Sequence, residues 1–138
     1  GAEAIKADED VAVRLKELNK GRLADKVIVC TGAVTAARQA LSLVERGGTI
    51  LFFAVPRPGD DVTLPLNDFW VNETKVMTSY YTSPVDVRNA LRLIGSGRVA
   101  VADLITHRLL LEKTGEGFRL VADAGESMKV MILPHGNV

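Results

Sequence analysis

The residues that could do chemistry in this 138-residue chain are few and widely spaced. A nucleophilic cysteine needs a base beside it, and the sequence names no base for Cys30, so a buried cysteine at a strand end is favoured. A catalytic zinc needs three protein ligands, and two distant histidines, His107 and His135, do not complete such a set with one cysteine. We therefore predict neither a catalytic residue nor a metal ligand in this chain.

Two glycine pairs begin the G-x-G pattern of a phosphate-binding loop. They are Gly95-Ser96-Gly97 and Gly115-Glu116-Gly117. Neither has the third glycine or lies between a strand and the start of a helix, and no Walker-type lysine motif is present. Both pairs are typical of helix ends or close packing.

More promising positions follow two apolar runs, at residues 27–30 and 50–55, with a helical pattern between them. Strand, helix and strand within about 30 residues predict a βαβ unit. Runs that are apolar at every position are typical of a parallel sheet buried on both faces. Ligands bind beyond the carboxyl ends of such strands, where Thr31-Gly32 and Val55-Pro56 stand.

The rest of the pattern predicts further elements of an α/β fold. We expect short or full strands at residues 3–6, 75–81, 104–111 and 128–133. We expect a first helix from the acids at 8–10 to Gly21, and a second that ends at Gly47-Gly48 and carries Ala37, Ala40, Leu41 and Val44 on its apolar stripe. A short helical turn capped by Asn67-Asp68 should bury Phe69 and Trp70. Two further helices should begin at Ser83-Pro84-Val85-Asp86 and span residues 114–122, the latter packing Phe118 and Val121.

Composition excludes several classes of partner. Hydrophobic residues make up 47% and charged residues 25%, as in ordinary globular proteins. Seventeen basic and seventeen acidic residues cancel, which argues against nucleic acid or an anionic membrane as a partner. No apolar run reaches the roughly 18 residues of a membrane span, and no signal peptide is visible. One cysteine indicates a reducing compartment, so we predict a cytoplasmic protein.

Short sequence motifs, spread over nearly the whole chain, occur in the same order as in one known protein family. The motifs are Gly1-Ala2-Glu3-Ala4-Ile5, Val29-Cys30-Thr31-Gly32-Ala33, Arg46-Gly47-Gly48-Thr49, Ala54-Val55-Pro56, Leu66-Asn67-Asp68, Ser79-Tyr80-Tyr81, Ser83-Pro84-Val85-Asp86-Val87-Arg88, Ile105-Thr106-His107-Arg108-Leu109 and Glu126-Ser127-Met128-Lys129-Val130. The chain resembles the carboxyl-terminal portion of zinc-dependent medium-chain alcohol dehydrogenases, in the sorbitol (polyol) and threonine dehydrogenase branch.

The resemblance implies a fold and a division into two parts. Residues 1–82 would form part of a Rossmann-type parallel sheet, strands three to six in the order 3-2-1-4-5-6. Residues 83–138 would form the carboxyl-terminal segment of the catalytic domain. The glycine fingerprint of strand one, the ribose-binding acid of strand two and the zinc ligands of the amino-terminal domain would lie outside this sequence.

The resemblance also implies cofactor-binding residues. Cys30, Thr31 and Gly32 would line the adenosine side of NAD or NADP; Ala54, Val55 and Pro56 would offer backbone groups to the nicotinamide amide; Tyr80 and Tyr81 would lie close to nicotinamide and substrate; and Lys129 would stand near the pyrophosphate. Two positions depart from the family pattern. Lys129 replaces the usual Arg, giving a point charge instead of a planar fork, and Ala54 replaces a common glycine.

The implied activity is hydride transfer between a polyol or secondary alcohol and a nicotinamide, with zinc polarising the alcohol oxygen in the full-length family. Alone, we expect this chain to be inactive, to hold no zinc and to bind nucleotide weakly. The alternative is a non-catalytic module for dimerisation or weak nucleotide binding. A response-regulator-like domain needs acids at its strand ends, where Thr31 and Val55 stand instead.

The implied partner is a second copy of the chain, because strand 75–81 would be the outermost of the sheet and would meet its mate there. Strand 27–30 would also lack its neighbour, strand one. Its unpaired groups would be satisfied by another chain, or by the short strand at residues 3–6 folding in beside it.

Overall fold

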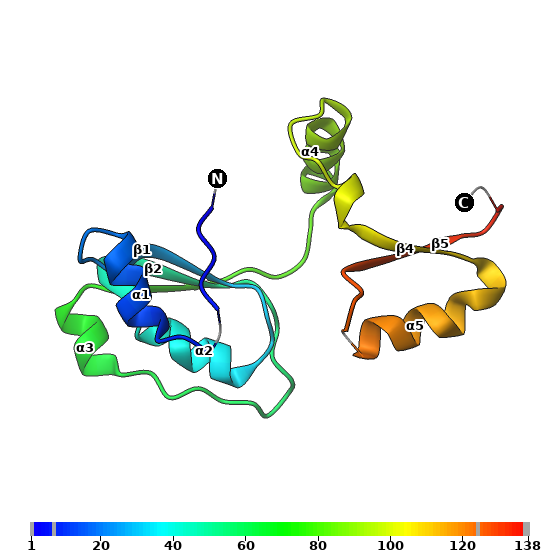
Figure 1. Ribbon diagram of the computed structural model, residues 1–138. Coiled ribbons are helices and arrows are strands. Elements are labelled where there is room, and N and C mark those ends of the chain that lie inside the picture. The colour runs from blue at the N-terminus through cyan, green and yellow to red at the C-terminus, as the bar shows by residue number, and fades with distance from the viewer. Residues whose placement is uncertain (1, 7, 124, 137–138) are drawn as a thin grey trace. The chain divides into compact units, whose positions relative to one another are not determined.

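A computed structural model of the chain describes residues 2–6, 8–123 and 125–136 (Figure 1). It divides the chain into two compact units, Gly1–Tyr81 and Thr82–Val138. The predicted boundary, between residues 82 and 83, lies one residue from this division. The assignment of the two parts to a cofactor domain and a catalytic domain stays a prediction.

The first unit is built on a three-stranded parallel sheet. Its elements are α1 (Val11–Leu18), β1 (Ala24–Val29), α2 (Val34–Leu41), β2 (Val44–Phe52), α3 (Leu66–Val71) and β3 (Lys75–Thr78). The strand order is β1-β2-β3, and both pairs run parallel. The α/β fold class is thereby confirmed. The predicted strand at residues 3–6 is wrong, because residues 2–6 have no regular structure, so the described sheet lacks the first of the four expected strands.

Helix α2 covers one face of this sheet. Successive strand residues alternate between faces, and the rows Val27–Ile50–Val76 and Val29–Phe52–Thr78 share the face that the helix covers. Figure 1 shows α2 beside β1 and β2. The buried hydrophobic residues described in the chain are Val29, Ala40, Ile50 and Phe69. This core is small, and Ile50 at its centre is fully buried on the middle strand.

Two predictions about glycine and tryptophan fail in this unit. Gly47-Gly48 does not end a helix: α2 ends at Leu41, and both glycines lie inside β2. Gly47 has a φ of +72° and donates its N–H to Asn72 O at 2.7 Å. A Cβ on buried Gly48 would lie 2.7 Å from Glu45 O, so this irregular part of β2 requires glycine. Trp70 is 81% exposed, because the short helix α3 presents Phe69 to the core.

The second unit contains a parallel strand pair joined through a helix. Its elements are α4 (Pro84–Gly95), the 3₁₀ turn η1 (Ala102–Leu104), β4 (Ile105–Leu110), the 3₁₀ turn η2 (Leu111–Lys113), α5 (Thr114–Asp123) and β5 (Lys129–Leu133). β4 pairs with β5 in parallel. The predicted start of α4 is confirmed, because Ser83 and Asp86 form a capping box and Pro84 occupies the first turn.

Helix α5 packs on β4 and β5 through Gly117. A Cβ there would lie 3.2 Å from Ile132 Cδ1, 3.3 Å from Val130 Cγ1 and 3.4 Å from Leu109 Cδ1. Phe118 and Val121 are exposed, so their predicted packing within this unit is wrong. Glycine, rather than a large apolar residue, sets the closest approach of helix and strands.

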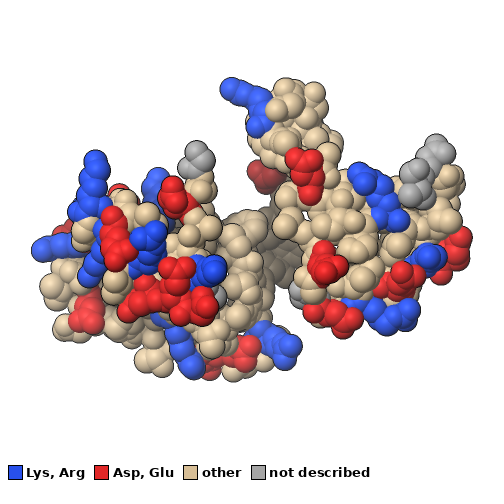
Figure 2. Space-filling view, viewed as in Figure 1, with Lys and Arg blue, Asp and Glu red and all other residues tan. Residues whose placement is uncertain are grey.

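The surface carries both signs of charge. On the face seen in Figure 2, basic and acidic side chains are interspersed, which agrees with the balanced count of 17 and 17. Within residues 2–6, 8–123 and 125–136, no helix is long and apolar enough to cross a membrane.

Candidate functional site

The predicted ligand-binding positions of the first unit follow the ends of its three strands. Val29, Phe52 and Thr78 form the last paired row of the parallel sheet. Their successors therefore lie at one edge of it. The predicted residues there are Cys30, Thr31 and Gly32 after β1, Ala54, Val55 and Pro56 after β2, and Tyr80 and Tyr81 after β3. The ninth, Lys129, begins β5 in the other unit.

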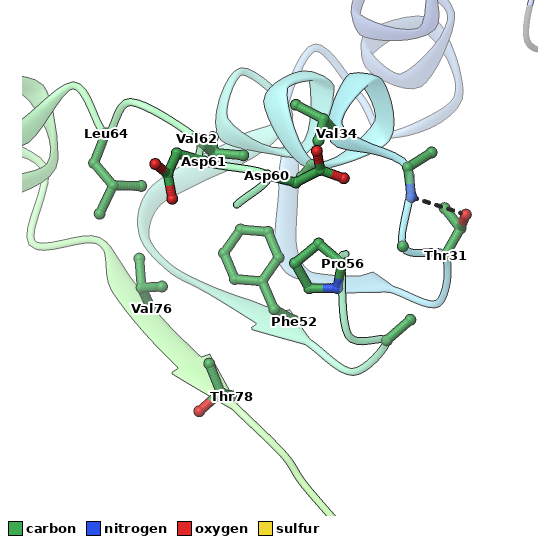
Figure 3. A pocket seen from close by; sticks show the side chains of 14 residues that line it. Thr31, Val34, Phe52, Pro56, Asp60, Asp61, Val62, Leu64, Val76 and Thr78 are labelled. Carbon is green, nitrogen blue, oxygen red and sulfur yellow. Dashed lines mark hydrogen bonds between the residues drawn. The ribbon is translucent and has the colours of Figure 1, made fainter. Parts of the chain in front are cut away.

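A pocket of about 280 Å³ opens at this edge. It lies between the start of α2, the ends of β2 and β3, and the loop that returns across them. Figure 3 shows Phe52 and Pro56 at its centre, with Val76 and Thr78 of β3 on one side. Small-molecule sites start at about 300 Å³, so the pocket is slightly smaller than a usual ligand site.

Four predicted cofactor residues line this pocket: Thr31, Gly32, Ala54 and Pro56. Its walls are mainly apolar side chains, and Thr31, Thr78, Asp60 and Asp61 supply the polar ones. Apolar walls with a few polar groups are typical of ligand sites. Such a lining can hold an apolar group by packing, and its backbone and hydroxyl groups can orient that group.

Close backbone packing fixes the pocket floor. A Cβ on Gly32 would lie 2.8 Å from Val55 O, so the turn after β1 touches the turn after β2. The N–H groups of Phe53 and Ala54 both donate to Val29 O, at 3.0 and 3.1 Å. The two turns are thus held together, and a side chain at position 32 would separate them.

Helix α2 begins beside the pocket without a side-chain cap. Its N-cap residue is Ala33, whose N–H donates to Thr31 Oγ1 at 3.3 Å, as drawn in Figure 3. The first backbone N–H groups of a helix lack partners within it and carry partial positive charge. Thr31 therefore orders the turn that leads into the helix and lines the pocket at the same time.

The remaining predicted residues of this unit lie outside the pocket. Cys30 is exposed, so its predicted burial is wrong; its neighbour Val29 takes the buried face as the strand alternates. Val55 is exposed and borders a second hollow with Arg57. Tyr80 and Tyr81 are also exposed, and their rings meet edge to face with centroids 4.3 Å apart. Tyr81 has a φ of +66°, which is strained for a non-glycine residue.

Several pocket residues were not predicted as site residues. They are Ala33, Val34, Ala37, Phe52, Asp60, Asp61, Val62, Leu64, Val76 and Thr78. The returning loop brings Asp60 and Asp61 over the strand ends (Figure 3). The sequence does show two adjacent acids directly after a Pro-Arg-Pro-Gly loop. It does not show that this loop passes over the strand ends, because the path of the loop depends on tertiary packing.

Metal chemistry has no centre in the part of the chain that is described. Within that part, no group of three His, Cys, Asp or Glu side chains could hold a metal ion. These residues do not fit the zinc site of a dehydrogenase, so we derive no step through zinc. That the chain by itself holds no zinc stays a prediction.

A parallel sheet whose successive strands are joined through a helix, with a pocket at its carboxyl edge, is the arrangement of an open α/β sheet that binds ligands at the ends of its strands. The sequence profile described as zinc-binding dehydrogenase matches residues 1–96. The chain therefore belongs to the zinc-binding dehydrogenase family.

Individual relatives agree with this assignment. Sorbitol dehydrogenase of Halalkalibacterium halodurans is 28% identical over 128 residues, which are 91% of this chain and 36% of that protein. The structure of an alcohol dehydrogenase from Thermotoga maritima matches with a TM-score of 0.80 at 22% identity, over 90% of this chain and 34% of that one. A structure from Sinorhizobium meliloti, described as a zinc-binding dehydrogenase bound to NADP, matches with a TM-score of 0.73 at 25% identity, over 81% and 32%. This chain thus spans about a third of each relative.

Proposed function

We propose that this chain is the carboxyl-terminal portion of an NAD- or NADP-dependent zinc-type dehydrogenase that acts on a polyol or another secondary alcohol. The observation that carries the proposal is the pocket at the carboxyl edge of β1, β2 and β3, which Thr31, Gly32, Ala54 and Pro56 line. Family membership and the resemblance to a sorbitol dehydrogenase support the class of reaction and substrate.

Within that enzyme the first unit would bind and orient the nucleotide. The apolar walls around Phe52 would pack against a ring, and the backbone at Ala54, Val55 and Pro56 would hold the nicotinamide amide. When bound, the nicotinamide supplies hydride transfer. Tyr80 and Tyr81 follow β3 at the same edge and would cover the substrate side. Lys129 would contribute charge to the pyrophosphate.

Two parts of a zinc-dependent dehydrogenase have no counterpart among the residues described. They provide no three-ligand metal set, and the sequence has no glycine fingerprint whose backbone amides would hold the pyrophosphate. We therefore propose that the chain by itself does not turn over alcohols. Its part in catalysis would be to position a nucleotide for residues supplied from elsewhere.

The test is an activity and metal assay of the isolated chain. Sorbitol, threonine and simple secondary alcohols would be offered with NAD and with NADP, and zinc would be measured per chain by mass spectrometry. We expect no steady turnover and no stoichiometric zinc. Turnover, or one tightly held zinc per chain, would refute the proposal. An upstream reading frame that encodes the glycine fingerprint and zinc ligands would support it.

We also propose that the chain forms a homodimer through β3. β3 ends the described sheet, and its Val76 and Met77 are exposed. Two separate compact bodies with the combined mass of 14.9 kDa would expose about 8,500 Å², whereas this chain exposes 11033 Å². The excess is of the size that obligate interfaces bury. In the proposed enzyme this surface would be covered by the rest of the protein, by a second copy, or by both, and we place the second copy at the open edge of β3.

One alternative to assembly can be set aside. The short strand expected at residues 3–6 would have satisfied the free edge of β1, but residues 2–6 form no strand. Light scattering at micromolar concentration tests the dimer. A clean monomer of the 14.9 kDa chain mass would contradict it. A dimer without nucleotide binding would favour the alternative function, a non-catalytic dimerisation module.

A cytoplasmic location is part of the same proposal. It rests on the single cysteine, which is typical of a reducing compartment. Fractionation of the source cells tests it, and recovery of the chain outside the cytoplasm would contradict it.

A further inference from the structure

The pairing of β4 with β5 leaves one residue of β4 without a partner on the other strand. Ile105 pairs with Lys129, but the next pair is His107 with Val130. Thr106 is therefore the extra residue of a bulge. Bulges interrupt the ladder of backbone hydrogen bonds and redirect neighbouring side chains, often beside functional sites.

The hydroxyl of Thr106 takes over the interrupted ladder. Thr106 Oγ1 donates to Lys129 O at 3.2 Å and accepts the N–H of Met128 at 3.0 Å. It also lies 3.0 Å from His107 Nδ1. One side chain thus fixes the backbone on both sides of the peptide bond between Met128 and Lys129, 22 and 23 residues away in the sequence.

Lys129 is the charged residue that this arrangement holds. It is exposed and borders a hollow of about 340 Å³ whose other lining residues are apolar: Val101, Leu104, Ile105, Met128 and Met131. A flexible ammonium group has a defined reach only if its backbone is fixed. Hydrogen bonds that support a binding residue from neighbouring elements determine how precisely that residue is placed.

We propose that Thr106 is a positioning residue for Lys129, acting through the two hydrogen bonds in which its hydroxyl donates to Lys129 O and accepts the N–H of Met128. The inference rests on the proposed function, in which Lys129 meets the pyrophosphate of the nucleotide. Thr106 would not touch the nucleotide itself. It would restrict the backbone of Lys129, the first residue of β5, so that less conformational freedom is lost when the ammonium group binds a phosphate.

The experiment titrates the isotope-labelled 138-residue chain with inorganic pyrophosphate and follows backbone amide signals by NMR. The variants are Thr106→Val, which keeps the branched shape and removes the hydroxyl, Thr106→Ser, which restores it, and Lys129→Ala. The matched control is Thr114→Val. It removes another threonine hydroxyl of the same unit, one that donates to Leu111 O at 2.5 Å.

We expect Thr106→Val to weaken pyrophosphate binding about fivefold, the effect of an ordinary hydrogen bond, and to speed hydrogen exchange at the Met128 amide. Thr106→Ser and Thr114→Val should bind within about twofold of the unaltered chain, and Lys129→Ala should lose binding. Melting curves of the two valine variants separate a placement effect from a general loss of fold.

Each other outcome overturns part of the account. Normal binding by Thr106→Val, beside lost binding by Lys129→Ala, overturns the inference alone. Equal losses in Thr106→Val and Thr114→Val, or no rescue by Thr106→Ser, also overturn it. Absence of pyrophosphate binding by the unaltered chain overturns the proposed role of Lys129, and the inference with it.

Discussion

Substitution of Gly32 by alanine tests the contact between the two turns that form the pocket floor. The new Cβ would lie 2.8 Å from Val55 O, whereas ordinary contacts begin at 3.4 Å. One turn must therefore move by about 0.6 Å. Extra atoms in a packed site cost about 1–3 kcal/mol. Gly32 does not have a positive φ, so alanine also removes some freedom of the unfolded chain, worth about 0.4–1 kcal/mol. The net destabilisation should be about 1–2 kcal/mol.

Urea unfolding followed by circular dichroism measures this loss, and amide NMR signals of Ala54 and Val55 report the displaced turn. The matched control is Gly95→Ala at the end of α4, where a Cβ would meet nothing within 4 Å. That control should be neutral or stabilise the chain by up to about 1 kcal/mol. If Gly32→Ala has unchanged stability and leaves those amide signals in place, the packing argument for the pocket floor is wrong.

Three further substitutions test the fold around the site. Hydrogen bonds from the N–H of Leu23 and, to a smaller extent, the N–H of Arg46 lower the pKa of Glu45 from its ordinary 4.5. The ionised Glu45 carboxylate therefore stabilises the fold fully above about pH 4.5, and this stabilisation is lost as the pH falls through the lowered pKa. Glu45→Gln should flatten the acid side of a plot of melting temperature against pH. Ser83→Ala should cost about 1 kcal/mol by removing the cap of α4, seen as lower helix content by circular dichroism; unchanged helix content would contradict the capping role. Ile50→Ala should cost about 2–5 kcal/mol because the side chain is fully buried, and a loss below 1 kcal/mol in urea unfolding would show that this core does not hold the sheet.

Sequence pattern located every expected strand except the one at residues 3–6, because an apolar run is a local signal. The apolar runs at residues 27–30 and 50–55 lie in or overlap neighbouring parallel strands, but β1 ends at Val29 and β2 at Phe52, and both strands begin earlier than predicted. The cap at Ser83 was also local, since its partner Asp86 is three residues away. Gly47 was misread because glycine signals a positive φ, which serves a strand irregularity as well as a helix end.

Burial of large residues and the full pocket lining could not be predicted in this way. Trp70 and Phe118 are hydrophobic, yet each neighbours the residue that takes the buried side of its helix, Phe69 and Gly117. The turns after β1 and β2 were found because parallel strands end together. Asp60 and Asp61 reach the pocket through a loop whose path is set by contacts distant in sequence.

We propose that the carboxyl edge of β1, β2 and β3 is a nucleotide site that is incomplete in this chain. Titration with NAD, followed by amide NMR, tests it most directly. We predict a dissociation constant in the millimolar range or weaker, on the order of −4 kcal/mol, with first-unit shifts confined to residues 30–32, 54–56, 80–81 and the pocket lining. A low-micromolar constant, or shifts in this unit only away from that edge, would contradict the account.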